Sequence, residues 1–119
     1  MDNGNDRIYP TGQINCKPLA PTSSACYSSI PVLELNETNM TATLVNHYLP
    51  PPSFFTFFGG NAELLPNGHL HANFTAAANG TIVQELDTQG SQVIWQGTTP
   101  GANQFHAYRW PSLYPGVQW

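Results

Sequence analysis

Charged residues are scarce in this chain. Only 8% of its 119 residues are Asp, Glu, Lys or Arg, against about 25% in an average globular domain. Three basic and seven acidic side chains give a formal net charge of −4, and so few basic groups cannot neutralise a run of phosphates. The composition therefore argues against nucleic acid and anionic membranes as partners.

Long hydrophobic runs are also missing. No stretch approaches the roughly 20 apolar residues that a helix needs to cross a bilayer. The N-terminal residues, MDNGND, lack the basic and apolar regions of a secretory signal peptide. We therefore expect no membrane insertion and no export signal.

Cysteine is rare too. The two cysteines, Cys16 and Cys26, lie in a stretch rich in Pro and Ser. A secreted domain pairs such cysteines, whereas a protein of a reducing compartment keeps them as thiols. The sequence leaves both states open.

Glycine and proline, by contrast, are abundant, with 10 and 11 residues. Turn signals such as Gly59-Gly60-Asn61, Asn67-Gly68 and Asn79-Gly80 recur at short intervals. We predict an all-β fold, an antiparallel β-sandwich of about eight strands with short loops. One domain should cover residues 7–119, after disordered or junction residues 1–6. The expected strands are residues 7–9, 13–16, 31–36, 40–48, 53–58, 62–65, 69–75, 81–86, 91–96 and 104–109.

Alternation of side chains assigns faces to two of these strands. In residues 40–48 we expect one set to face the core: Met40, Ala42 and Leu44. In residues 69–74 we expect a buried set, Leu70, Ala72 and Phe74, and a set that faces water, His69, His71 and Asn73. A sheet with one wet face is typical of antiparallel folds.

Few residues indicate catalysis or metal binding. His69 and His71 have a spacing that can direct two imidazoles to one Zn²⁺, but a polar strand face that happens to hold two histidines is the favoured explanation. Two further histidines could complete such a set only if folding brings them near: His47 and His106. Glu85 and Asp87 could share acid and base roles, but such pairs also serve solubility alone. We expect no enzyme, no cofactor and no metal.

The aromatic residues carry more information. The stretch FFTFF, residues 54–58, places Phe at both alternating positions, so both faces of a strand there are apolar and need cover. Either partner subunits supply that cover, or a bent strand is buried on both sides within one chain. Phe55 and Phe57 are the candidates for subunit contacts.

The same region resembles the mid-domain signature of adenovirus fibre heads. In that family an apolar strand ending in Phe precedes a turn with Asn, a short apolar pair, a polar turn and a further Leu. The matching elements here are FFTFF, GGNA, ELL, PNGH and Leu70. RIYPT at residues 7–11 is similar to the junction of shaft and head, with Tyr9 in place of its tryptophan, and INC ending at Cys16 is similar to the Asn-Cys after it. The resemblance covers residues 7–75.

This resemblance implies a β-sandwich that forms a homotrimer at the distal tip of a virion fibre, assembled in the host-cell nucleus. Its role would be to bind a host-cell receptor, protein or glycan, without catalysis. The cysteines would then stay thiols. It implies trimer contacts at Tyr9, Phe55 and Phe57, and receptor contacts in the loop after Cys16, with the candidates Lys17, Ser23, Ser24 and Tyr27.

Two alternatives remain beside this hypothesis. One is the tip of another viral or phage spike. The other is a monomeric carbohydrate-binding module or lectin, since an exposed tryptophan face can stack on a sugar ring. The tryptophans that motivate it are Trp95, Trp110 and Trp119. The mass of the chain in solution separates a trimer from a monomeric module.

Overall fold

The computed structural model describes residues 6–9, 12–16, 25–51, 54–56, 58–77 and 80–110. The strands in this part are β1 (Asp6–Tyr9), β2 (Gly12–Asn15), β3 (Ile30–Asn36), β4 (Thr41–Tyr48), β5 (Asn61–Leu64), β6 (Leu70–Ala77), β7 (Gly80–Leu86) and β8 (Val93–Thr99). All their pairings are antiparallel. The predicted all-β antiparallel class is therefore confirmed. The described residues contain no helix long and apolar enough to cross a membrane.

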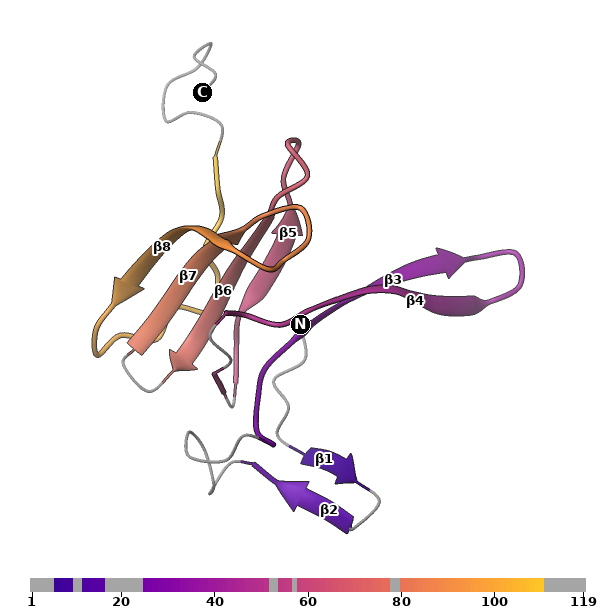
Figure 1. Cartoon of the computed structure of the whole chain (residues 1–119), viewed down its shortest axis with the longest axis horizontal. Helices are drawn as coiled ribbons and strands as arrows, with labels where there is room; N and C mark the ends of the chain where they lie inside the picture. The colour runs from indigo at the N-terminus through magenta and orange to yellow at the C-terminus, as the bar shows by residue number, and fades with distance from the viewer. Residues whose placement is uncertain are drawn as a thin grey trace.

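The strands form three separate sheets (Figure 1). Strands β5 to β8 form a four-stranded sheet in chain order, with β5 and β8 at its edges. Strands β1 and β2 form one hairpin and β3 and β4 form another. Sequential strands joined by tight turns explain the simple order. A sandwich of two packed sheets stays a prediction.

One face of the four-stranded sheet carries the larger hydrophobic core. Leu70, Ala72 and Phe74 of β6 are buried in it together with Leu86 of β7, which confirms the inward set predicted from alternation. The β3–β4 hairpin covers this face at its base, where Ile30 begins β3 and Tyr48 ends β4. Phe54 packs edge-on against Phe74, with ring centroids 4.7 Å apart.

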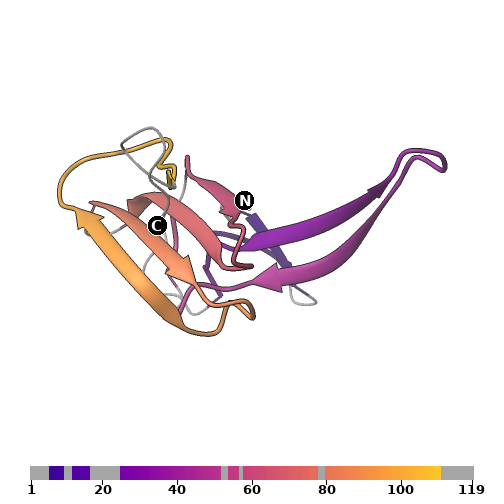
Figure 2. The ribbon, with the colours of Figure 1, turned by 90° about the horizontal axis from the view of Figure 1, so that it is seen from above.

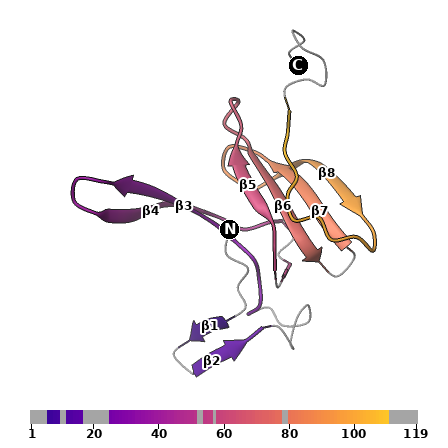
Figure 3. The same cartoon turned by 180° about the vertical axis from the view of Figure 1, so that it is seen from behind.

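The opposite face of the sheet carries polar side chains, but two of them are shielded from solvent. His71 and Asn73 are buried, so the prediction that this face meets water is wrong for both. The cause is the segment of residues 102–109, here called the strap, which crosses the face after β8 (Figure 3). Local alternation cannot reveal a cover that arrives from a distant part of the chain.

Side chains of the sheet hold the strap. Thr81 Oγ1 donates to the carbonyl oxygen of Ala102 at 2.8 Å and accepts from the backbone nitrogen of Gln104 at 2.9 Å. Asn73 Nδ2 donates to the carbonyl oxygen of Gln104 at 2.9 Å, and Thr75 also donates to that oxygen. Residues 104–109 are therefore no strand, contrary to expectation, because side chains bind their backbone.

The expected strand at residues 53–58 is also absent from its described part, residues 54–56 and 58. Ser28 ties this segment down instead. Its backbone nitrogen donates to the carbonyl oxygen of Phe54 at 2.9 Å, and its Oγ accepts from the backbone nitrogen of Thr56 at 2.9 Å. One backbone hydrogen bond and one bond to the Ser28 side chain take the place of a strand ladder here.

The β3–β4 hairpin projects away from the sheet (Figure 2). Its register sets Leu33 opposite Leu44 and Leu35 opposite Ala42, so these four side chains share one face. The set expected to face the core, Met40, Ala42 and Leu44, is instead exposed in the single chain. The hairpin extends beyond the edge of the sheet, and Met40 belongs to its turn, with a φ of 53°.

A disulfide joins the N-terminal hairpin to the rest of the chain. Cys16, just after β2, pairs with Cys26, with their Cα atoms 5.3 Å apart, so the expectation of free thiols is wrong. Phe55 packs on this bridge, and Ile14 of β2 packs beside it. The bridge and Phe55 together form a second small core.

Candidate functional site

Four side chains form a row across the polar face of the sheet. Glu63 of β5 lies opposite His71 of β6, His71 lies opposite Glu85 of β7, and Glu85 lies opposite Trp95 of β8. Directly opposite residues of antiparallel strands point to the same face. The fold thus aligns two carboxylates, an imidazole and an indole, which stand far apart in sequence.

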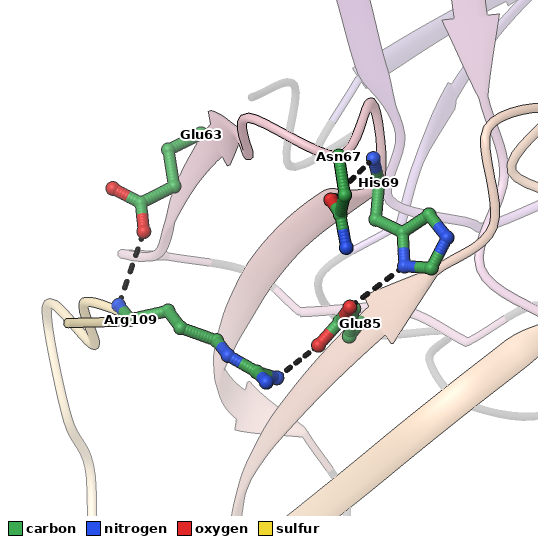
Figure 4. Close-up of polar contacts among 5 residues, drawn as sticks. All are labelled: Glu63, Asn67, His69, Glu85 and Arg109. Carbon is green, nitrogen blue, oxygen red and sulfur yellow. Dashed lines mark hydrogen bonds and ion pairs between the residues drawn. The ribbon is translucent and has the colours of Figure 1, made fainter. Parts of the chain in front are cut away.

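Glu85 is the centre of the polar contacts (Figure 4). Its Oε1 lies 2.7 Å from Nδ1 of His69, and its Oε2 contacts the guanidinium of Arg109. Asn67, in the turn between β5 and β6, holds His69 by accepting its backbone N–H at 3.0 Å. Both oxygens of a nearly buried carboxylate are therefore compensated, as a buried charge requires.

Arg109 crosses the row above His71. Its backbone nitrogen donates to Oε1 of Glu63 of β5 at 3.0 Å, while its guanidinium reaches Glu85 of β7 (Figure 4). Beneath it, both ring nitrogens of His71 are buried without a hydrogen-bond partner in the described part of the chain. The end of the strap therefore closes over an unsatisfied imidazole, a costly arrangement.

The environment of Glu85 changes its ionisation. Burial raises the pKa of the carboxyl, but the His69 hydrogen bond, the charge of Arg109 and an Asn67 hydrogen bond outweigh it, so the pKa lies below its ordinary value. The ionised form is the one that binds the strap. Charge and hydrogen bonding thus dominate over desolvation at this position.

Trp95 lies at the open end of the row. It is 50% exposed, and its indole covers Gly97, where an added Cβ would lie 2.8 Å from Cη2 of the ring. Gly97 follows two residues later on the same face of β8. One side of the indole therefore rests on bare backbone while the other side faces solvent.

Of the predicted receptor contacts, only Tyr27 lies within the described residues, half-buried beside Cys26. Lys17, Ser23 and Ser24 lie outside them, as does Phe57. Tyr9 of β1 pairs with Gly12 of β2, and only the backbone of Tyr9 is described. Phe55 is 5% exposed and packs on the disulfide of its own chain, so an intramolecular contact supplies its cover.

The predicted chemical pairs are not assembled. His47 lies on the projecting hairpin and His106 stacks on Tyr108 in the strap, so neither joins His69 and His71. Asp87 turns into the loop after β7 and accepts the backbone N–H of Ser91 at 2.7 Å, away from Glu85. In the described part of the chain, no group of three or more His, Cys, Asp or Glu side chains could hold a metal ion.

A cleft of about 500 Å³ lies at the outer end of the β3–β4 hairpin. Its lining is Glu34, Leu35, Asn36, Glu37, Thr41 and Thr43. Register places Glu34 opposite Thr43 and Asn36 opposite Thr41, so this is the polar face of the hairpin. The hairpin therefore has one polar and one apolar face, both exposed.

Sequence reasoning singled out His69, His71, Glu85 and Trp95 separately, but it missed Glu63 and Arg109. A signal for Glu63 was available, since it is the acidic residue of a strand that forms a hairpin with residues 69–75. Nothing local pointed to Arg109, because its role depends on the path of the strap.

No protein-family model, curated protein or solved structure matches this chain.

Proposed function

We propose that this chain is the head of a viral attachment fibre, a non-catalytic domain that assembles as a homotrimer and binds a host-cell receptor. The apolar face of the β3–β4 hairpin carries this proposal. The resemblance of residues 7–75 to adenovirus fibre heads supports it, and so does a polar face that holds the strap rather than an assembled catalytic pair.

The apolar face of the hairpin lacks cover in the single chain. Leu33, Leu35 and Leu44 are 53%, 69% and 57% exposed, and they lie together because Leu33 faces Leu44 and Leu35 faces Ala42. A two-stranded hairpin is marginally stable alone and needs packing on a hydrophobic face. A clustered apolar patch on a soluble protein marks an interaction surface.

The occupant that we assign to this face is a second copy of the same chain. Leu64, on the edge strand β5, is 58% exposed and lies opposite Leu70, on the core side of the sheet. In a closed ring each hairpin would pack against the core side of the next chain's sheet. The β-sandwich would then be completed between chains, with the hairpin as its second layer.

The experiment compares two faces of one hairpin. Leu35→Lys with Leu44→Lys places charge on the apolar face, and Thr43→Lys places it on the polar face as the matched control. All three positions are exposed in the single chain, so the fold should survive, as circular dichroism would verify. Light scattering should give three times 13.0 kDa for the wild type and for Thr43→Lys, and one chain for the double variant.

A wild-type mass of one chain would overturn the assembly, and so would equal masses for the double variant and the control. Attachment is tested separately with fluorescently labelled protein on a panel of vertebrate cell lines. Three linked sites bind a cell surface far more tightly than one. The wild type should therefore label cells, the double variant should label them weakly, and unlabelled wild type should compete.

A further inference from the structure

We propose that the exposed face of Trp95, next to the Glu85 carboxylate that holds Arg109 and His69, binds the ring of a neutral saccharide. This inference rests on the proposed attachment function and gives its receptor a chemical class, a glycan. Its basis is the row of Glu63, His71, Glu85 and Trp95 and the way in which the strap leaves one end of that row open.

Trp95 provides a rigid, flat apolar surface. Gly97 has no side chain, so the six-membered ring of the indole can lie along β8, and an added Cβ would meet three of its carbons at 2.8 to 3.6 Å. Trp95 as a whole is half-exposed. A tryptophan held in this way offers a large contact area with little conformational entropy to lose.

The strap determines which part of the sheet can bind. Its hydrogen bonds reach Asn61 of β5, Asn73 of β6 and Thr81 of β7, while Trp95, on edge strand β8, stays exposed. An open surface thus adjoins a covered one. The boundary between them, at Glu85 and Arg109, supplies polar groups beside an apolar platform, the usual composition of a small-molecule site.

Arg109 and His69 are oriented for hydroxyl groups. Glu85 fixes both, through the guanidinium of Arg109 and Nδ1 of His69. The Arg109 side chain is 43% exposed and the His69 side chain 25%. Since a guanidinium has five N–H donors, Arg109 can contact Glu85 and still donate to a ligand. Nε2 of His69 has no partner in the described part of the chain.

The local charge favours a neutral ligand. The carboxylate of Glu85, directly opposite Trp95, is paired with the guanidinium of Arg109 and the imidazole of His69. An anionic ligand on Trp95 would meet the Glu85 carboxylate, and the repulsion would offset its attraction to Arg109. The C–H face of a pyranose ring can lie on the indole while its hydroxyls reach the polar groups.

The test uses the whole chain on biosensor surfaces that carry β-galactosyl, α-mannosyl or N-acetyl-β-glucosaminyl groups. At least one surface should bind the wild type. Trp95→Ala should weaken that binding about tenfold or more, since stacking on the aromatic ring is lost. Gly97→Ala should weaken that binding similarly, because the added methyl group would displace the indole from its position over residue 97. Trp110→Ala is the control, an exposed tryptophan at the end of the described strap region, and should bind as the wild type does.

Light scattering of each variant separates this inference from the proposed function. If Trp95→Ala keeps the wild-type mass and loses saccharide binding, the site is supported. The saccharide site is wrong if the wild type binds none of the three surfaces, or if Trp95→Ala and Trp110→Ala bind alike. Neither result would contradict the proposed trimer. A Trp95→Ala variant that loses its trimeric mass would mark Trp95 as a subunit contact and overturn the saccharide assignment.

Discussion

The side-chain amide of Asn61 pairs with the backbone of Ala107, 46 residues further along the chain. Its Nδ2 donates to the carbonyl oxygen of Ala107 at 2.9 Å, and its Oδ1 accepts from the Ala107 nitrogen at 2.9 Å. One amide thus satisfies both backbone groups of a strap residue, as a neighbouring strand would. This pair fixes the strap at the β5 edge, immediately before Arg109 reaches Glu63 and Glu85.

Asn61→Ala should release this end of the strap. Loss of two hydrogen bonds, each worth about 1 kcal/mol, should raise the open population of the strap about tenfold or more. Trypsin reports it at the bond after Arg109, because the other basic residues are Arg7 and Lys17, and Lys17 is followed by Pro18. Asn103→Ala, an exposed residue of the same strap, is the control. Equal cleavage rates for the two variants would show that the Asn61 pair does not hold the strap.

The stability of the protein should fall in acid through Glu85. Its pKa is lowered in the folded chain, so the stabilisation that it gives is fully present above the ordinary pKa of about 4.3. That stabilisation is lost as the pH falls through the lowered folded value. Glu85→Gln should cost about 1–3 kcal/mol at neutral pH.

Urea unfolding between pH 3 and 7 measures this effect. The wild-type free energy of unfolding should decline more steeply below the ordinary pKa of a glutamate than that of Glu85→Gln, so the two curves should converge in acid. Parallel curves would mean that Glu85 is not the acid-sensitive contact. Trypsin cleavage after Arg109 should rise together with the loss of stability, because Glu85 binds the Arg109 side chain.

Gly90→Ala should strongly destabilise the protein, because Gly90 is buried in the turn between β7 and β8. Gly90 has a φ of +69°, and its added Cβ would lie 1.9 Å from Cδ1 of Tyr48, a buried ring of the larger core. Left-handed strain and overpacking together should cost about 2–5 kcal/mol. Gly101→Ala is a matched control, with a φ of +67° and nothing within 4 Å of its added Cβ. It should cost only the backbone strain, about 1–2 kcal/mol, and equal melting temperatures would contradict the Tyr48 contact.

The disulfide should stabilise the N-terminal hairpin. Replacing Cys16 and Cys26 by Ala should lower the free energy of unfolding by about 2–4 kcal/mol, since a closed loop restricts the unfolded chain. Phe55 should lose packing at the same time, because it rests on the bridge. Thiol titration of the denatured, unreduced protein should find no reactive thiol, and reduction should release both. Full labelling without reductant would contradict the pairing.

Local sequence patterns were sufficient to predict β6, β7 and the buried face of β6. Alternation at residues 69–74 predicted the buried set Leu70, Ala72 and Phe74, and the turn signals Asn67-Gly68, Asn79-Gly80 and Gln89-Gly90 predicted the strands β6 and β7 between them. These features depend on contacts between neighbours in the sequence. The period of two in a strand makes them visible without coordinates.

The arrangement of the candidate functional residues depended on contacts between segments that are distant in the sequence. The apolar run in residues 53–58 predicted a strand, but Ser28 binds Phe54 and Thr56, and the described residues 54–56 form none. The face of His71 was expected to contact water because its residues are polar, and its cover, the strap, lies more than thirty residues away in sequence. Whether two cysteines pair is decided by whether folding brings their Cα atoms close enough.

The sequence by itself determined the antiparallel all-β class, the hairpin turns and the inner face of β6, because these follow from the period of side chains and from residues that accept a positive φ. Only the tertiary structure decided that Glu63, His71, Glu85 and Trp95 stand in one row and that Arg109 crosses it. Strand register and the path of the strap fix that arrangement, and both result from contacts between segments far apart in the chain.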